Sequence, residues 1–199
     1  MAKPERKKLK IRCGDSDCNN GLHCFRVTAR TVSNFAAGTC QACGADPVDW
    51  QRVQQRAPGD VENTFASLGH EFVRTYFMQL PAGEDAQSYA RRKGRIGLHA
   101  AARKRLKQSI GPAHPFRDGT QTPMLEDSNN PIWNAQHATA TCCRRCTEYW
   151  HGIARGRALT SGELDYLTGL VTKYLDEKLP DLADEPSAVY RLTKDTGNE

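Results

Sequence analysis

The stretch GRALTSGELDYLTGLVTKYLDEKLP, Gly156 to Pro180, contains the clearest helix signal in the sequence. Thr160 and Glu163 have the spacing of a capping box, in which a hydroxyl and a carboxylate satisfy backbone N–H groups where a helix begins. Apolar residues then recur every three or four positions, at Leu164, Leu167, Val171, Tyr174 and Leu175. Pro180 ends the pattern. The stretch therefore predicts a long helix with one buried face, in a domain that is mostly helical.

Two further helical segments precede this one. From Asp60 the residues Phe65, Leu68, Phe72, Tyr76 and Phe77 form one apolar stripe, which predicts a helix that ends by Pro81. A second helical segment is expected from about 84 to 110, with a break where Gly94 and Gly97 interrupt it. Residues 111–133 are rich in proline and glycine, and a loop of this length in a compact domain is usually functional or disordered.

The chain before these helices contains five of the eight cysteines. Cys40 and Cys43 form a CxxC pair, a turn that offers two thiolates to one zinc ion. The other two ligands are expected from Cys13, Cys18 and Cys24, with His23 as a weaker candidate. Cys13 and Cys18 are the simplest first pair, and Cys24 is then a buried thiol or a substitute ligand. The sequence LHCFRVTARTV, residues 22–32, favours a strand or hairpin arm between the two pairs.

These patterns predict an α+β protein that is mostly α. Residues 1–50 are expected to form a small zinc-ribbon-like β module, 60–180 a helical domain with a second zinc motif, and 181–199 a mobile acidic tail. No stretch approaches the about 20 apolar residues of a membrane span, and the first ten residues are too polar for a signal core. We expect a cytoplasmic protein, where clustered cysteines indicate metal binding and not disulfides.

The second zinc motif is HATATCCRRCTEYWH, residues 137–151. Cys143 and Cys146 repeat the CxxC spacing, and His137 and His151 flank them, so the four residues could complete one ligand set. In a continuous helix His151 would lie about 140° around from Cys146, so the pair must lie in a turn that precedes the helix. If this stretch were helical, Cys142 would replace Cys143 as the partner of Cys146 in the ligand pair. It remains open whether both histidines bind, and an iron–sulfur cluster is disfavoured because it needs a fourth thiolate or an accepted histidine.

Three strings, GLHAAARKRL, DGTQTP and AQHATATCCRRCTEYWHGIARGRALTSGELDYL, resemble an uncharacterised family of bacterial proteins, a domain of unknown function. The resemblance covers about residues 95–176, and longer members carry a cysteine-rich front end with an LHCFR-like segment. It implies no activity. It does imply that the five cysteine and histidine positions His137, Cys142, Cys143, Cys146 and His151 act as one unit, with Asp118, Gln121 and Thr122 near them. Arg145 stands where a small residue is expected.

The charge distribution favours a nucleic-acid-binding function. Residues 91–107 have no acidic residue and eight basic ones, namely Arg91, Arg92, Lys93, Arg95, Arg103, Lys104, Arg105 and Lys107. Against this, the pI of about 8.8 is below the value above 9 that is typical of such domains. A metal-dependent hydrolase or nuclease with Glu148 or Asp118 as base, and an adaptor that meets an acidic protein partner, are the alternatives. Two zinc ions are the expected cofactors.

Overall fold

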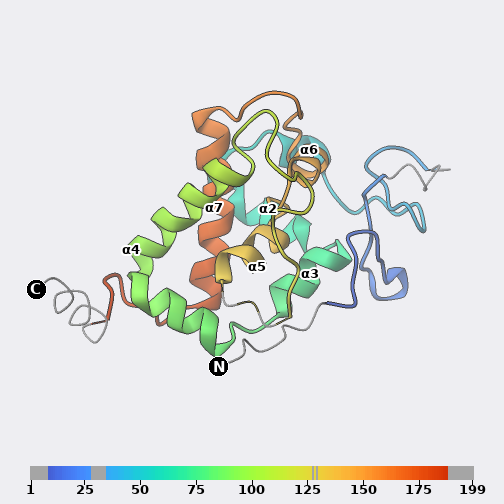
Figure 1. The fold of residues 1–199 in the computed structure, drawn as a ribbon. Coiled ribbons are helices and arrows are strands. Elements are labelled where there is room, and N and C mark those ends of the chain that lie inside the picture. The colour runs from blue at the N-terminus through green and yellow to red at the C-terminus, as the bar shows by residue number, and fades with distance from the viewer. Residues whose placement is uncertain (1–8, 28–34, 127, 129, 188–199) are drawn as a thin grey trace, which may run out of the picture.

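The computed structural model describes residues 9–27, 35–126, 128 and 130–187. Its α-helices, shown in Figure 1, are α1 (Trp50–Gln54), α2 (Val61–Leu68), α3 (Phe72–Gln79), α4 (Glu84–Ser109), α5 (Pro131–Ala138), α6 (Arg144–His151) and α7 (Ser161–Lys178). Helix α7 lies centrally, with α4 packed along one side and α5 and α2 also against it. In the described part of the chain no helix is both long enough and apolar enough to cross a membrane.

Helix α7 begins and packs as its sequence predicts. The Thr160 hydroxyl accepts from the Glu163 N–H at 3.2 Å, and the Glu163 carboxylate accepts from the Thr160 N–H at 2.9 Å, so the predicted capping box is confirmed. The buried face then meets α4 and α5 in one apolar core, which includes Leu167, Leu170, Val171, Leu98, Leu106 and Ile132. Burial of these side chains is the main favourable contribution to the stability of the helical body.

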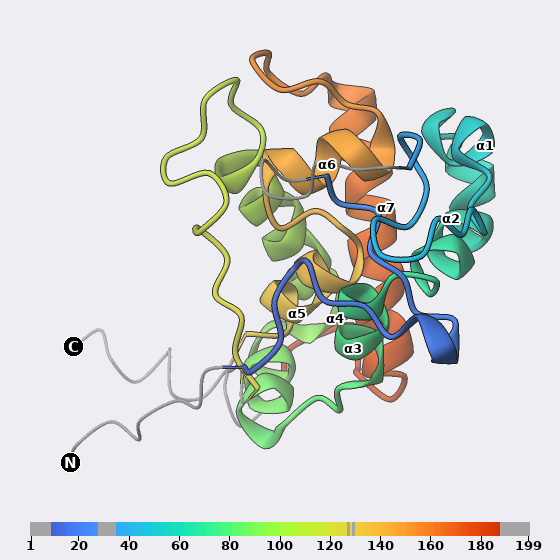
Figure 2. The same ribbon diagram turned by 90° about the vertical axis from the view of Figure 1, so that its right-hand side faces the viewer.

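The single stripe expected between residues 65 and 77 is divided into two helices. Helix α2 ends at Leu68 and α3 begins at Phe72. The turn between them pairs with the N-terminal segment: the His23 N–H donates to the His70 carbonyl at 2.8 Å, and the Phe72 N–H donates to the His23 carbonyl at 2.9 Å. Figure 2 shows this segment running as coil past α5 and α3. The division of the helix therefore provides backbone groups that hold the cysteine-rich segment.

The break predicted in the second long helix is confirmed at Gly94. Its backbone has φ 67° and ψ 168°, so α4 is two helical pieces joined by a kink. A Cβ at this position would lie 2.4 Å from the Asp184 carbonyl, so only glycine fits. The Arg95 N–H donates to the Ala183 carbonyl at 2.8 Å and the Ile96 N–H donates to the Asp184 carbonyl at 3.2 Å. Residues 188–199 of the expected acidic tail lie outside the described residues.

The predicted α+β class is wrong. The described residues contain helices and two isolated β-bridges, Asp17 with Leu22 and His23 with Glu71, but no strand or sheet. Residues 22–27 of the predicted hairpin arm are extended without a ladder, because the backbone of His23 pairs with the α2–α3 turn instead of a second strand. Residues 28–32 of that arm lie outside the described part. The described part of the predicted β module is therefore coil apart from a 3₁₀ turn at Cys18–Asn20, and no sheet stabilises it.

Candidate metal centres

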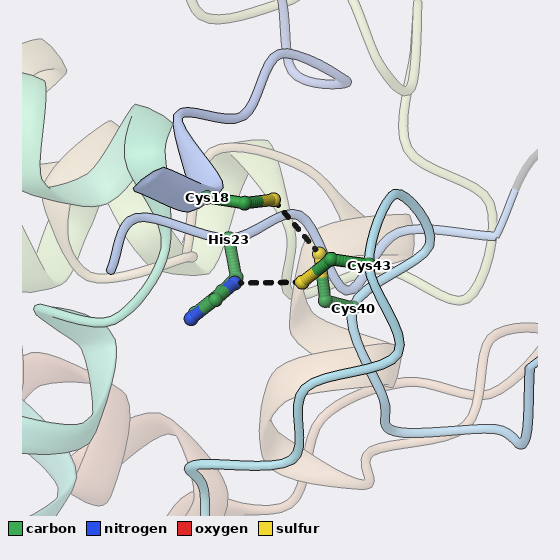
Figure 3. Close-up of side chains that lie close together, drawn as sticks. All are labelled: Cys18, His23, Cys40 and Cys43. Atoms are coloured by element: carbon green, nitrogen blue, oxygen red, sulfur yellow. Dashed lines mark hydrogen bonds between the residues drawn. The ribbon is translucent and has the colours of Figure 1, made fainter. Parts of the chain in front are cut away.

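The first candidate centre consists of Cys18, His23, Cys40 and Cys43, whose ligand atoms all lie within 4.8 Å of one another. Figure 3 shows the four side chains converging from three separate parts of the coil. The Cys18 and Cys40 sulfurs are 3.7 Å apart, and the Cys43 sulfur is 3.5 Å from Nδ1 of His23. Tetrahedral zinc, with bonds of about 2.3 Å to sulfur and about 2.0 Å to nitrogen, requires edges of about 3.5–3.8 Å. Both measured distances match such edges, so these four residues could hold one tetrahedral ion.

The backbone of the Cys40–Cys43 turn is arranged around the sulfur of its first cysteine. The Ala42 N–H donates to Sγ of Cys40 at 3.4 Å, and the Gly44 N–H donates to the Cys40 carbonyl at 2.8 Å. Gly44 closes the turn at φ 79°, in the left-handed region. Desolvation acts to raise the pKa of the Cys40 thiol, but backbone hydrogen bonds outweigh it and lower that pKa to about 6. The turn thus stabilises a thiolate, the form that binds metal.

The structure groups only part of the predicted N-terminal set. Cys18, Cys40 and Cys43 come together with His23, the candidate that the sequence ranked lowest. Cys24 is buried, and its thiol donates to the Cys13 carbonyl at 3.7 Å; burial raises its pKa to about 11. A signal for His23 was present, because three cysteines and one histidine are an ordinary structural zinc set. Spacing alone did not distinguish this set from one with Cys13 or Cys24.

The second candidate centre consists of Cys142, Cys143 and Cys146, whose sulfurs also lie within 4.8 Å of one another. Cys143 is the N-cap of α6, and its sulfur accepts from the Cys146 N–H at 3.5 Å. The prediction that the pair lies in a turn before the helix is wrong for Cys146, because α6 begins at Arg144 and includes Cys146. Cys142 and Cys143, which the sequence offered as alternatives, are both in the group. Three sulfurs gathered in this way could hold one metal ion.

A buried ion pair lies against the second centre. Arg74 and Glu71 are 0% and 1% exposed, and Nε of Arg74 donates to the Glu71 carboxylate at 2.7 Å. Nη2 of Arg74 donates to the Cys146 sulfur at 3.4 Å, and Nη1 donates to the His137 carbonyl at 2.6 Å. The Trp150 indole N–H donates to Glu71 at 2.6 Å. The guanidinium therefore orients and partly neutralises a thiolate, as outer-shell partners of metal ligands do.

One of the three thiols carries the charge. Hydrogen bonds from Cys142 and Cys143, together with the charge of Arg74, hold the pKa of Cys146 well below its ordinary value, although burial opposes this. The same hydrogen bonds and burial raise the pKa of Cys142 well above its ordinary value. The arrangement thus favours the thiolate at Cys146, and a bound cation would take the place of the protons on the other thiols.

The two flanking histidines have different environments. Nε2 of His151 donates to the Thr139 carbonyl at 3.0 Å, and its Nδ1 is 3.3 Å from the Tyr166 hydroxyl, so both ring nitrogens are engaged away from the cysteines. Nε2 of His137 donates to the Pro123 carbonyl at 3.2 Å, but its buried Nδ1 has no hydrogen-bond partner. Burial and then the charge of Arg74 lower the pKa of His137 to about 4. His137 is therefore a neutral imidazole.

A cavity of about 240 Å³ adjoins the three cysteines. Its wall includes His137 and, from the N-terminal segment, Cys13, whose sulfur is 3.9 Å from that of Met124. Asp118 also lies on the wall, where its carboxylate accepts from the Arg144 N–H at 2.8 Å. Glu148, the other candidate base, instead pairs with Arg155 at 2.7 Å.

The loop with Gln121 and Thr122, which the family resemblance predicts near the cysteines, approaches this centre. The Thr122 hydroxyl donates to the Cys142 carbonyl at 3.0 Å, and the Gln121 carbonyl accepts from Arg105 at 2.7 Å. Arg105 also donates to Gln136 at 3.2 Å. This basic side chain therefore braces the loop beside the cysteines.

The remaining basic side chains of residues 91–107 fall into three groups: paired with acids, placed over an aromatic ring, or exposed. Arg95 pairs with Asp176 at 2.8 Å and Arg103 pairs with Asp165 at 2.6 Å, so acids of α7 neutralise both. Lys93 lies over the Tyr89 ring at 5.1 Å. The exposed members are Arg91, Arg92, Lys104 and Lys107. Half of the predicted patch thus faces solvent.

The fold and the two groups define a helical protein with cysteine and histidine clusters that could hold metal ions. The family described as domain of unknown function DUF4186 matches residues 62–176, which is more than half of the chain, and the chain belongs to this family. This match confirms the resemblance to an uncharacterised family. No solved structure matches the chain. The matched region contains the second centre, whereas the first centre precedes it.

Proposed function

We propose that this is a zinc protein that holds one ion at each cysteine cluster. The observation that carries the proposal is the convergence of Cys18, His23, Cys40 and Cys43 at edges of 3.5 and 3.7 Å, which match a tetrahedral ion. Thiolate and imidazole ligands in a tetrahedral set favour zinc over magnesium, calcium or manganese. A set of four protein ligands leaves no position for substrate, so the first centre is structural.

The proposal is tested by the metal content of the purified full chain, measured by mass spectrometry. We expect two zinc ions per chain, one ion in Cys40→Ser and one in Cys146→Ser. Cys24→Ser is the matched control, because it removes a buried thiol outside both groups and should keep both ions. Unchanged metal content in the first two variants, or iron in the wild-type chain, would overturn the proposal. The proposal includes a cytoplasmic location. It is supported by the free thiols of all eight cysteines, which are typical of a reducing compartment.

Nucleic-acid binding through α4 is a second proposal. It is supported by the exposed side chains of Arg91, Arg92, Lys104 and Lys107, which lie on a helix whose segment 91–107 has no acidic residue. Lys104 and Lys107 form no ion pair within the described part of the chain. Cations in this arrangement contact phosphates without reading sequence. The pairing of Arg95 and Arg103 with α7 limits the contact to a short patch.

A titration of labelled single-stranded and duplex oligonucleotides at increasing salt tests this second proposal. The variant Lys104→Ala/Lys107→Ala should weaken binding and reduce the slope of log affinity against log salt by about 2. Lys10→Ala removes an exposed cation outside α4 and should change the slope less. Absence of binding at low salt would remove the proposal and would favour an acidic protein partner for the same face.

A further inference from the structure

The second centre lacks one ligand of a tetrahedral set. Three cysteine sulfurs form the group, and the adjoining cavity is lined by further metal-binding side chains that do not belong to the set of ligand atoms within 4.8 Å of one another. The metal-binding candidates on its wall are His137, Cys13 and Asp118. The identity of the fourth ligand decides whether the centre is closed by the family domain, closed by the N-terminal segment, or open for a water or substrate.

The ring of His137 is prepared as a ligand. A carbonyl can only accept, so the 3.2 Å contact with Pro123 fixes the proton on Nε2 and leaves a lone pair on Nδ1. That Nδ1 is buried and has no hydrogen-bond partner. The residue is only 3% exposed and lies on the cavity wall. The ring stacks on Phe77 with centroids 4.6 Å apart, which holds its orientation. Metal-bound histidines characteristically donate their second ring N–H to a backbone carbonyl.

The chain between His137 and the cysteines is folded back on itself. Ala140, a residue with a Cβ, has φ 54°, in the left-handed region that such residues seldom adopt. The Thr141 N–H donates to the Gln136 carbonyl at 2.8 Å, and the Gln136 amide donates to the Thr141 carbonyl at 3.0 Å. This turn reverses the chain directly after His137, so the cysteines that follow lie on the wall of the same cavity. Strained backbone of this kind is retained where surrounding contacts or function require it.

The other two candidates are less suited to the fourth position. The Asp118 carboxylate already accepts from the Arg144 N–H at 2.8 Å and from the Gln121 amide at 3.3 Å. Cys13 is half-buried, and its sulfur contacts Met124. Cys13 also lies before the family-matched residues 62–176, whereas His137 lies within them.

We infer that Nδ1 of His137 is the fourth ligand of the second centre and closes Cys142, Cys143 and Cys146 into a site for one zinc ion. The inference rests on the proposed zinc function. It places all four ligands inside the DUF4186 domain, so the family domain binds its ion without help from the N-terminal segment. His151, at the far end of the motif, is then a structural residue held by Thr139 and Tyr166.

The direct test is cadmium NMR of the full chain with isotope-labelled histidine nitrogens. Cadmium replaces zinc at thiolate sites, and each centre gives its own resonance. We expect one resonance coupled to Nδ1 of His137 and a second coupled to Nδ1 of His23, which serves as the internal reference. Coupling of the second centre to no histidine would overturn the inference, even if variants of His137 fail to fold.

Variants provide the second arm of the test. His137→Ala should weaken metal binding at the second centre by more than the about 100-fold that loss of an outer-shell partner can cost, and should leave the first centre unchanged. His137→Cys should restore binding, with the cobalt spectrum of a four-thiolate site. Cys13→Ser is the matched control and should bind as the wild type does.

The two failures are distinguishable. A wild-type chain that holds only one ion, with Cys146→Ser unchanged, overturns the proposed function and the inference together. Two ions in the wild type, with loss in Cys13→Ser and none in His137→Ala, overturns the inference alone and assigns the fourth position to the N-terminal segment.

Discussion

The N-terminal segment, residues 9–49, and the helical body, residues 61–179, are stabilised in different ways. In its described residues, 9–27 and 35–49, the segment contains one short 3₁₀ turn and few buried apolar side chains, whereas α4, α5 and α7 share an extensive apolar core. A coil of this length cannot bury enough apolar surface to offset the entropy lost on ordering. Under the proposed zinc function, the ion is the principal stabiliser of the segment, whereas apolar packing stabilises the body.

The same CxxC spacing has a different structure in each region. After Cys40 and Cys43 the chain turns through Gly44 at φ 79° and continues as coil. Cys143 instead caps α6 and Cys146 lies in its first turn. An ion bound at the first centre would join distant parts of the chain, and one at the second would join residues of one short motif. Loss of the first ion should therefore disrupt more of the structure around it than loss of the second.

The largest expected effect is removal of the first ion. Structural zinc supplies apparent binding free energies of about 10–16 kcal/mol in zinc-finger peptides. We expect Cys40→Ser to abolish protection of residues 9–49 from hydrogen exchange and proteolysis, while the far-ultraviolet circular dichroism of the helices remains. Cys146→Ser should leave protection of residues 9–49 intact. A segment that stays protected without metal would show that packing alone stabilises it.

The next effect concerns Arg74, which connects the two regions. Its partner Glu71 forms a backbone bridge with His23 of the first centre, and its own guanidinium contacts Cys146 of the second. Arg74→Met leaves the buried Glu71 charge unpaired, so we expect a loss of about 3–5 kcal/mol in the free energy of unfolding, measured with denaturant. Metal binding should weaken at both centres.

Arg103→Met is the matched control for this prediction. Its pair with Asp165 is 42% and 61% exposed, and such surface pairs contribute about 0–1 kcal/mol. Equal losses in the two variants would contradict the role given to the buried network. Weakened metal binding at only one centre would show that the two regions are independent.

Local signals in the sequence predicted local structure well. The capping box of Thr160 and Glu163 and the break at Gly94 were both confirmed, because each depends on residues within a few positions. The strand after Leu22 was not found, because the hydrogen bonds of His23 go to residues 70 and 72, about fifty positions away. No sequence pattern specifies such a pairing.

In the candidate sites, too, the sequence predicted the local pattern but not the tertiary contacts. The CxxC pairs were visible in the sequence, but His23 and His137 could not be separated from the other candidates by spacing. His137 and His151 flank the second cluster almost symmetrically, yet the turn at Ala140 places one ring on the cavity wall, and Thr139 and Tyr166 hold the other elsewhere. Tertiary contacts make this distinction, and these depend on the whole chain.

A smaller effect is expected from the core of the helical body. Leu167 is fully buried between α4 and α5, and Leu167→Ala should cost about 3 kcal/mol through the lost transfer energy and the cavity. Thermal unfolding should shift downward by about 10 °C. The zinc content of the first centre, measured below this transition, should stay unchanged. Loss of that ion would contradict the separation of the two regions.

The smallest effect concerns the start of α7. The Arg157 guanidinium, and after it the Thr160 hydrogen bonds, lower the pKa of Glu163 from 4.5 to about 2, although partial burial opposes this. A depressed carboxylate pKa contributes stability that is complete above about pH 4.5 and is lost as the pH falls through about 2. Glu163→Gln should cost about 1 kcal/mol at neutral pH, a figure kept low because Arg157 is 45% exposed.

The pH profile separates this electrostatic contribution from packing. The stability difference between wild type and Glu163→Gln, measured with denaturant at each pH, should shrink below about pH 4.5 and vanish near 2. Acid release of zinc affects both chains equally and cancels in the difference. Glu177→Gln alters the exposed partner of a pair with Lys173 on the same helix and should change stability less. A pH-independent difference would assign the effect of Glu163 to packing of the cap, since lost packing does not titrate.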